Sequence, residues 1–306
     1  MTGLRRALIG LAVLGAVACG SAPFQATPSP SPSPSPSPSP SPPPLPSLSP
    51  PPPPGAALWL LGEVHDNAAL HTLRLQTLQT LLHQGARPAL LMEQFDRERQ
   101  GQIDALLQRA PGQAPDDAER DRTVNALVRL GGAAPGWQWD FYRPYLDLAL
   151  RYRLPLVAAN VSRSDARALM AQGLAAHGFE PAVPADIGAA QAGQIERSHC
   201  GQITAAQAGR MVNAQVARDQ FMARQVAAQA GRGVVLLAGN GHVRKDVGVP
   251  RWLAPALQAR TRVVGFVEAG PADDSDAAAF DQTISAAAAT RNDPCAALRP
   301  AAAASR

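Results

Sequence analysis

The sequence has 306 residues, of which 30 are proline, and its formal net charge is +4. Arg5 and Arg6 lie in a segment that we expect to be removed, which leaves about +2 on the mature chain. A charge so close to neutral excludes the basic signature of a nucleic-acid-binding protein.

Residues 1–18 have the layout of a secretory signal peptide, with a basic start and small residues before Cys19. Their apolar stretch, Ala7 to Val17, is too short to span a bilayer comfortably. "AVAC" resembles a bacterial lipoprotein signal, in which cleavage precedes the cysteine and that cysteine carries acyl chains such as palmitate. Gly20 favours sorting to the outer membrane. The alternative is an ordinary export signal with an incidental cysteine.

A Ser/Pro-rich segment follows, so that residues 19–55 form a lipidated, disordered tether. Proline at every second position blocks helix and sheet hydrogen bonding and favours extended polyproline II. Such a tether reaches on the order of 100 Å. We predict that it is a spacer, with glycosylation or partner binding as the alternative.

Residues 56–298 form one domain, and a disordered tail follows at 299–306. Apolar runs without alternation predict five strands, each followed by a helical pattern. The expected strands are 57–62, 88–93, 155–160, 233–239 and 262–269. This alternation predicts an α/β fold, a mostly parallel sheet covered by helices on both faces.

The helical patterns lie between these strands. Leucines at helical spacing follow Asn67, a predicted N-cap, and end near Gly85. Further helices are expected within 96–130, broken at "APGQAP", and over 139–153, 162–172 and most of 181–231. The long helical regions predict an insertion or a cap subdomain.

Polar side chains follow four of the predicted strands. "GEVH", Gly62–His65, and "GNGH", Gly239–His242, are both G-x-x-H motifs that come directly after apolar runs. Glu93 and Asn160 end two further strands. Ligands of open α/β sheets bind beyond the carboxyl ends of the strands, so we expect these residues to line one cleft.

Glu63, His65, Glu93 and His242 permit two kinds of chemistry. Two imidazoles and two carboxylates are suitable ligands for a divalent metal such as Mn, Co or Zn. Without a metal, crowded carboxylates raise one another's proton affinity, so that Glu63 and Glu93 serve as general acid and general base. The alternative is a pair of structural histidines and a carboxylate that caps a turn.

Two cysteines remain once Cys19 is lipidated. An even pair in an exported protein favours a disulfide between Cys200 and Cys295. The alternative is two separate thiols.

Five stretches together resemble the ChaN family of haem-binding lipoproteins, which is grouped with Tiki-type metalloproteases and erythromycin-esterase-like proteins. They are "LLGEVHDN", "PALLMEQFDRERQ", "WDFYRPYLDLALRYRLPLVAANVSRSDAR", "HCGQI" and "VVLLAGNGHVRKDVGVP". The resemblance covers residues 57–268 and implies an α/β core with a helical subdomain, a surface anchor and a role in haem or iron acquisition. Glu63, His65, Glu93 and His242 fall on the positions that the wider group shares.

Haem requires an axial tyrosine or histidine, cations or N–H donors for its propionates, and apolar walls. Tyr142 is the predicted axial ligand, with Tyr145 as a second candidate. The predicted haem-binding residues are Tyr142, Arg143, His65, His242, Arg244 and Lys245. The alternative for the two tyrosines is an aromatic helix that packs on the sheet.

The sequence therefore predicts a lipid-anchored haem-binding protein of the outer membrane that captures or stores haem for iron acquisition. The alternative is a metal-dependent hydrolase, a peptidase or an esterase. A haem held between two subunits would require a homodimer, and a haem receptor or transporter is the expected further partner.

Overall fold

The computed structural model describes residues 57–108, 116–132, 136–270, 278–293 and 295–296. The predicted signal peptide, the lipidation site Cys19, the tether and the C-terminal tail lie outside these ranges. None of the helices within them is long and apolar enough to cross a bilayer.

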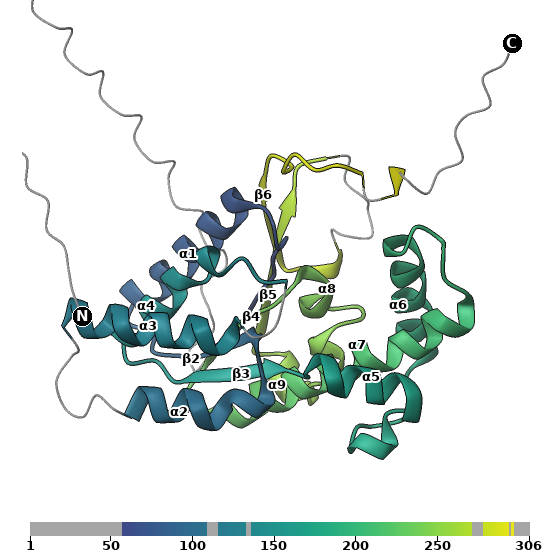
Figure 1. Ribbon diagram of the computed structural model, residues 1–306, viewed down its shortest axis with the longest axis horizontal. Helices are drawn as coiled ribbons and strands as arrows, with labels where there is room; N and C mark the ends of the chain where they lie inside the picture. The colour runs from purple at the N-terminus through teal and green to yellow at the C-terminus, as the bar shows by residue number, and fades with distance from the viewer. Residues whose placement is uncertain (1–56, 109–115, 133–135, 271–277, 294, 297–306) are drawn as a thin grey trace, which may run out of the picture. The chain divides into compact units, whose positions relative to one another are not determined.

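A six-stranded, all-parallel sheet forms the centre of the domain (Figure 1). The strands are β1 (Leu58–Leu61), β2 (Ala89–Asp96), β3 (Leu156–Asn160), β4 (Val234–Leu237), β5 (Thr261–Glu268) and β6 (Gln282–Ala286). Their order across the sheet is β3-β2-β4-β1-β5-β6. Leu61 at the end of β1 pairs with Leu237 at the end of β4, so the segments that follow these two strands start side by side.

The helices of the described ranges lie mostly between the strands in the chain. The α-helices are α1 (Ala68–His83), α2 (Gln100–Gln108), α3 (Asp117–Gly131), α4 (Arg143–Arg151), α5 (Arg163–Gln172), α6 (Ala185–Ser198), α7 (Ala205–Gln229), α8 (Asn240–Val243) and α9 (Pro255–Gln258). The 3-10 helices are η1 (Arg97–Arg99), η2 (Trp139–Phe141), η3 (Ala175–His177) and η4 (Val249–Trp252). Asn67 caps α1 as predicted, because its Oδ1 accepts the Leu70 N–H at 3.1 Å.

Helices cover both faces of the sheet, because alternate residues of each strand point to opposite sides. Trp59 and Leu61 of β1 pack with α1, α3 and α4, whereas Leu58 and Leu60 pack with α7. A third apolar cluster joins α5, α6 and the first half of α7, and Figure 1 shows these helices as a group beside the sheet. The α/β fold and the helical subdomain are confirmed.

Two strands differ from the prediction. β6 was not expected, because only Ile284 of its five residues is buried and the segment has no apolar run. β2 continues to Asp96, three residues beyond the expected end, because Phe95 packs in the core and keeps the chain extended after Glu93.

Candidate functional site

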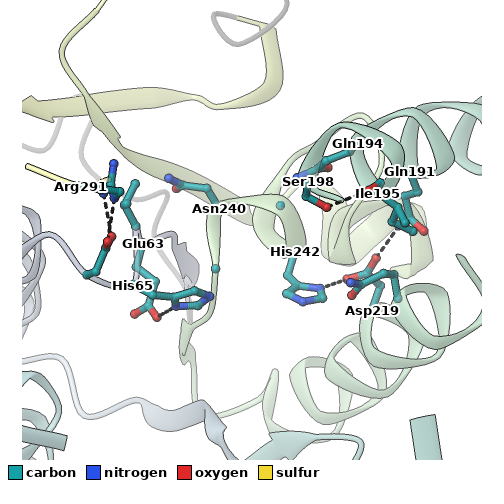
Figure 2. Close-up of a pocket in the computed structure, with 15 residues that line it drawn as sticks. Glu63, His65, Gln191, Gln194, Ile195, Ser198, Asp219, Asn240, His242 and Arg291 are labelled. Carbon is teal, nitrogen blue, oxygen red and sulfur yellow. Dashed lines mark hydrogen bonds and ion pairs between the residues drawn. The ribbon is translucent and has the colours of Figure 1, made fainter. Parts of the chain in front are cut away.

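The two G-x-x-H turns lie against each other at the carboxyl edge of the sheet (Figure 2). A side chain at Gly62 would overlap the Asn240 amide. A Cβ at Gly239 would lie 3.4 Å from His65 Nε2 and 3.8 Å from Glu93 Oε2. Glycine is therefore needed at position 62, because a side chain there would separate the two turns, whereas a Cβ at Gly239 would make ordinary van der Waals contacts.

Glu63 is the buried centre of the first half of the site. Its carboxylate accepts hydrogen bonds from His65 Nδ1 and, at 2.7 Å, from the Tyr142 hydroxyl. It also pairs with the buried guanidinium of Arg74. Burial alone would raise the pKa of Glu63, but the charge of Arg74 and the His65 hydrogen bond lower it to about 2. Glu63 is therefore ionised at neutral pH.

A second layer holds Arg74 in place. Its Nε donates to the Tyr145 hydroxyl at 3.2 Å, and its Nη2 lies 3.4 Å from His71 Nδ1. His71 Nε2 lies 3.1 Å from the backbone carbonyl of His65. Burial and the charge of Arg74 lower the pKa of His71 to about 4. A neutral His71 with its proton on Nε2 satisfies both of its contacts. Its Nδ1 accepts from Arg74, and its Nε2 donates to the backbone carbonyl of His65.

His71 makes the stability of the domain depend on pH. The pKa of His71 in the folded state is about 4, below the ordinary 6.5. The neutral imidazole therefore contributes stability that is fully present above pH 6.5 and is lost as the pH falls from 6.5 through 4. We expect His71→Gln to remove this loss, which amounts to about 3 kcal/mol. Urea unfolding between pH 7.5 and 4 measures it, with His83→Gln at the exposed end of α1 as the control. Parallel curves for wild type and His71→Gln would contradict this role.

His242 is the centre of the second half of the site. Its Nδ1 lies 2.6 Å from Asp219 Oδ1, and its Nε2 lies 3.5 Å from Glu93 Oε1. Asp219 is fully buried in α7, and its other oxygen accepts from Gln191 at 3.0 Å. Burial would lower the pKa of His242, but Glu93 and Asp219 outweigh it and raise that pKa. A buried carboxylate that fixes an imidazole in this way orients it for proton transfer.

Two cavities open at this edge of the sheet. The larger, of about 620 Å³, lies between the two turns and helices α6 and α7, and its apolar surface comes from residues that include Val64 and Ile195. The smaller, of about 250 Å³, is lined by residues that include Trp137 and Asn160. His65 lines both cavities.

His65 is the most accessible titratable group of the motif residues. Its side chain is 52% exposed, while the side chain of Glu63 beneath it is 2% exposed. The Trp137 ring stands perpendicular to the imidazole at 4.9 Å. Burial would lower the pKa of His65, but its hydrogen bond and charge interaction with Glu63 raise it. Because Glu63 holds Nδ1, Nε2 is the nitrogen that His65 presents to a ligand.

The structure brings Glu63, His65, Glu93 and His242 to one edge of the sheet, where they form two separate pairs. Glu63 binds His65, and Glu93 faces His242. The described residues contain no group of three or more His, Cys, Asp and Glu side chains placed to hold a metal ion. The single four-ligand metal set of the sequence analysis is therefore not assembled, because Arg74 and Tyr142 occupy the Glu63 carboxylate.

Tyr142 does not lie at the surface of either cavity. Its side chain is fully buried, and its hydroxyl donates to Glu63. Burial and the negative charge of Glu63 raise its pKa, which disfavours the phenolate that would bind iron. Tyr145 is also fully buried, and its hydroxyl donates to the His71 carbonyl at 3.0 Å. This geometry weighs against the predicted axial ligand and favours the packing alternative for both tyrosines.

The three cations predicted for the propionates contact other partners and line neither cavity. Arg143 donates to Asn125 of α3 at 2.8 Å. Arg244 pairs with Asp246 at 2.8 Å, and Lys245 pairs with Asp281 at 2.9 Å. The residue types suited the chemistry, but the structure pairs these side chains with residues that line neither cavity.

The predicted disulfide is present and joins Cys200, just after α6, to Cys295, with their Cα atoms 5.6 Å apart. Arg291, four residues before Cys295, lies at the larger cavity and pairs with both Asp66 and Glu268 at 2.7 Å. Arg291 could not be predicted from the sequence, because its partners come from distant segments of the chain.

Comparisons with known proteins give a structure with the same fold and a family match. ChaN of Campylobacter jejuni, whose structure is described as cofacial haem binding, is 20% identical over 74% of this chain and 86% of its own, with a TM-score of 0.56. A mutant of the erythromycin esterase EreC in its open conformation is 16% identical over 71% of each chain, with a TM-score of 0.39. No curated protein matches significantly. Residues 55–253 match the family of haem-binding uptake proteins of the Tiki superfamily, ChaN, and the chain belongs to that family.

Proposed function

We propose that this protein binds haem at the edge of the larger cavity, with His65 Nε2 as the axial ligand of the iron. The observation that carries the proposal is the position of His65, whose imidazole is half exposed between two cavities while buried Glu63 holds Nδ1. A carboxylate bound to the other ring nitrogen fixes the tautomer and increases the basicity of a ligating histidine.

The lining of the cavity fits several requirements of haem. Val64 and Ile195 supply apolar surface in the larger cavity, and Trp137 supplies a flat wall beside His65. Gln194 and Asn240 add amide groups. Haem would supply an iron centre when bound, and the chain would supply the His65 nitrogen to hold it, the orientation of the ring and partial exclusion of water.

The biological setting of this function extends the proposal. The family match and the cofacial haem of Campylobacter jejuni ChaN support haem as the ligand. The lipoprotein-like signal, Cys19 and the Ser/Pro segment support a domain tethered to the outer membrane. We infer that the domain captures or stores haem there for iron acquisition, passes it to a receptor or transporter, and covers the open haem face by pairing with a second copy.

Hemin titration tests the proposal at pH 8, where protons compete less with iron for Nε2. We expect saturable binding with a shifted Soret band. His65→Ala should weaken binding by roughly 100-fold and change the spectrum, because it removes an iron ligand. His83→Ala, which changes an exposed histidine of α1, should behave as wild type. The absence of saturable binding in wild type would refute haem capture, and an unchanged His65→Ala spectrum would refute this ligand.

A further inference from the structure

The smaller cavity contains a guanidinium without an anionic partner. Arg218 of α7 lines this cavity and is partly buried. Its Nη1 lies 3.4 Å from Gln215 Oε1, and its buried Nε has no hydrogen-bond partner among the described residues. No ion pair joins Arg218 to a carboxylate in that part of the chain. A buried donor left unpaired costs about 1–3 kcal/mol, so a shift of the side chain that lets a ligand pair it would be favourable.

A second unpaired group belongs to a residue that lines the same cavity. Asn160 ends β3 and lines the smaller cavity, and only 9% of the residue is exposed. Its Oδ1 has no hydrogen-bond partner among the described residues. Arg218 and Asn160 come from different elements, yet both leave polar atoms unsatisfied at one cavity. Buried polar groups are usually satisfied, so both atoms are exceptions, but the Asn160 oxygen is an acceptor and only the Arg218 N–H can donate to an anion.

Neither carboxylate of the smaller cavity forms an ion pair with Arg218 among the described residues. Glu93 accepts the Gly239 N–H at 2.8 Å and faces His242. Burial raises the pKa of Asp96, and the charge of Arg218 only partly opposes that rise. Arg163 contributes a second guanidinium to the lining. Of the residues that line this cavity, Arg218 therefore remains a cation without an ion pair among the described residues and can bind an anion.

We propose that the smaller cavity is a carboxylate subsite, in which Arg218 binds a carboxylate arm of the ligand that His65 holds. His65 lines both cavities, so one ligand can contact the imidazole and Arg218 together. An arginine fork matches the two oxygens of a carboxylate. The inference rests on the proposed function for the identity of that ligand, whose carboxylate arm is then a haem propionate.

Titration with hemin and hemin dimethyl ester, which lacks free carboxylates, tests the subsite. Wild type should bind hemin about tenfold to a hundredfold tighter than the ester, because charge-assisted hydrogen bonds form only with hemin. Arg218→Gln should lose this preference and keep its affinity for the ester. Arg210→Gln, an exposed arginine of the same helix, is the matched control and should keep the preference. An undiminished preference in Arg218→Gln overturns the subsite.

A second measurement separates the subsite from haem binding itself. NMR of the arginine Nε–H signals, with benzoate as an iron-free aromatic carboxylate, should show a saturable shift of the Arg218 signal. Benzamide, which carries no charge, should cause no such shift. If hemin fails to bind but benzoate shifts the signal, the proposed function fails and the subsite stands. If benzoate leaves the signal unchanged, the subsite is refuted whether or not hemin binds.

Discussion

Replacement of Arg74 by methionine is expected to lower the free energy of unfolding by about 3–5 kcal/mol, because it leaves an ionised carboxylate buried without its partner. Arg74 is fully buried and pairs with Glu63, whose side chain is 2% exposed. No other cation among the described residues touches the Oε2 atom of Glu63. Urea unfolding at pH 7 measures the loss, and Arg122→Met on the exposed surface of α3 should change stability by less than about 0.5 kcal/mol.

A double-mutant cycle shows whether the loss belongs to the pair. Glu63→Gln alone leaves the Arg74 guanidinium buried without a counter-charge, so it should also be destabilising. The double variant Glu63→Gln, Arg74→Met removes both charges and should lose less stability than the sum of the single losses, by about 1–3 kcal/mol. Additive losses would show that the two side chains act independently, which would contradict the buried pair as the support of the His65 turn.

The convergence of the two G-x-x-H turns could be predicted from the sequence, because the apolar runs before Gly62 and Gly239 identify parallel strands. The carboxyl ends of such strands share one edge, whichever neighbours they have. The direct pairing of β1 with β4 then brings the turns into contact. β6 could not be predicted, because an edge strand with one buried residue has no pattern to distinguish it from a loop.

The partners of the motif residues could not be predicted in the same way. Asp219 and Arg218 are neighbours in an Ala-rich helix, and periodicity predicts the helix without showing which of its polar side chains face the sheet edge. Asp219 fixes His242, and Arg218 lines the smaller cavity. The prediction of Tyr142 as a haem ligand meets the same limit. The amino-acid type indicates which chemistry is possible but not where the side chain points, and the Tyr142 side chain is buried. Side-chain direction is set by packing between segments far apart in the chain.

Removal of the Cys200–Cys295 disulfide is expected to lower the free energy of unfolding by about 4 kcal/mol. The bond joins residues 95 positions apart, so it restricts the unfolded chain over much of the domain. The variant Cys200→Ala, Cys295→Ala measures the loss by urea unfolding. Dithiothreitol should reproduce the loss in wild type and have no further effect on the variant, which controls for the reduction of other bonds through Cys19.

The disulfide is also expected to hold the C-terminal segment at the larger cavity. Arg291 pairs there with Asp66 and Glu268, but these pairs are exposed, and exposed ion pairs contribute at most about 1 kcal/mol. Arg291→Gln should therefore cost little stability, whereas reduction should increase amide hydrogen exchange at residues 287–293 far more than in β1. Equal exchange in the oxidised and reduced proteins would show that non-covalent contacts, which include those of Arg291 and Asn67, are enough to secure the segment. The disulfide would then stabilise the domain as a whole without holding residues 287–293 at the larger cavity.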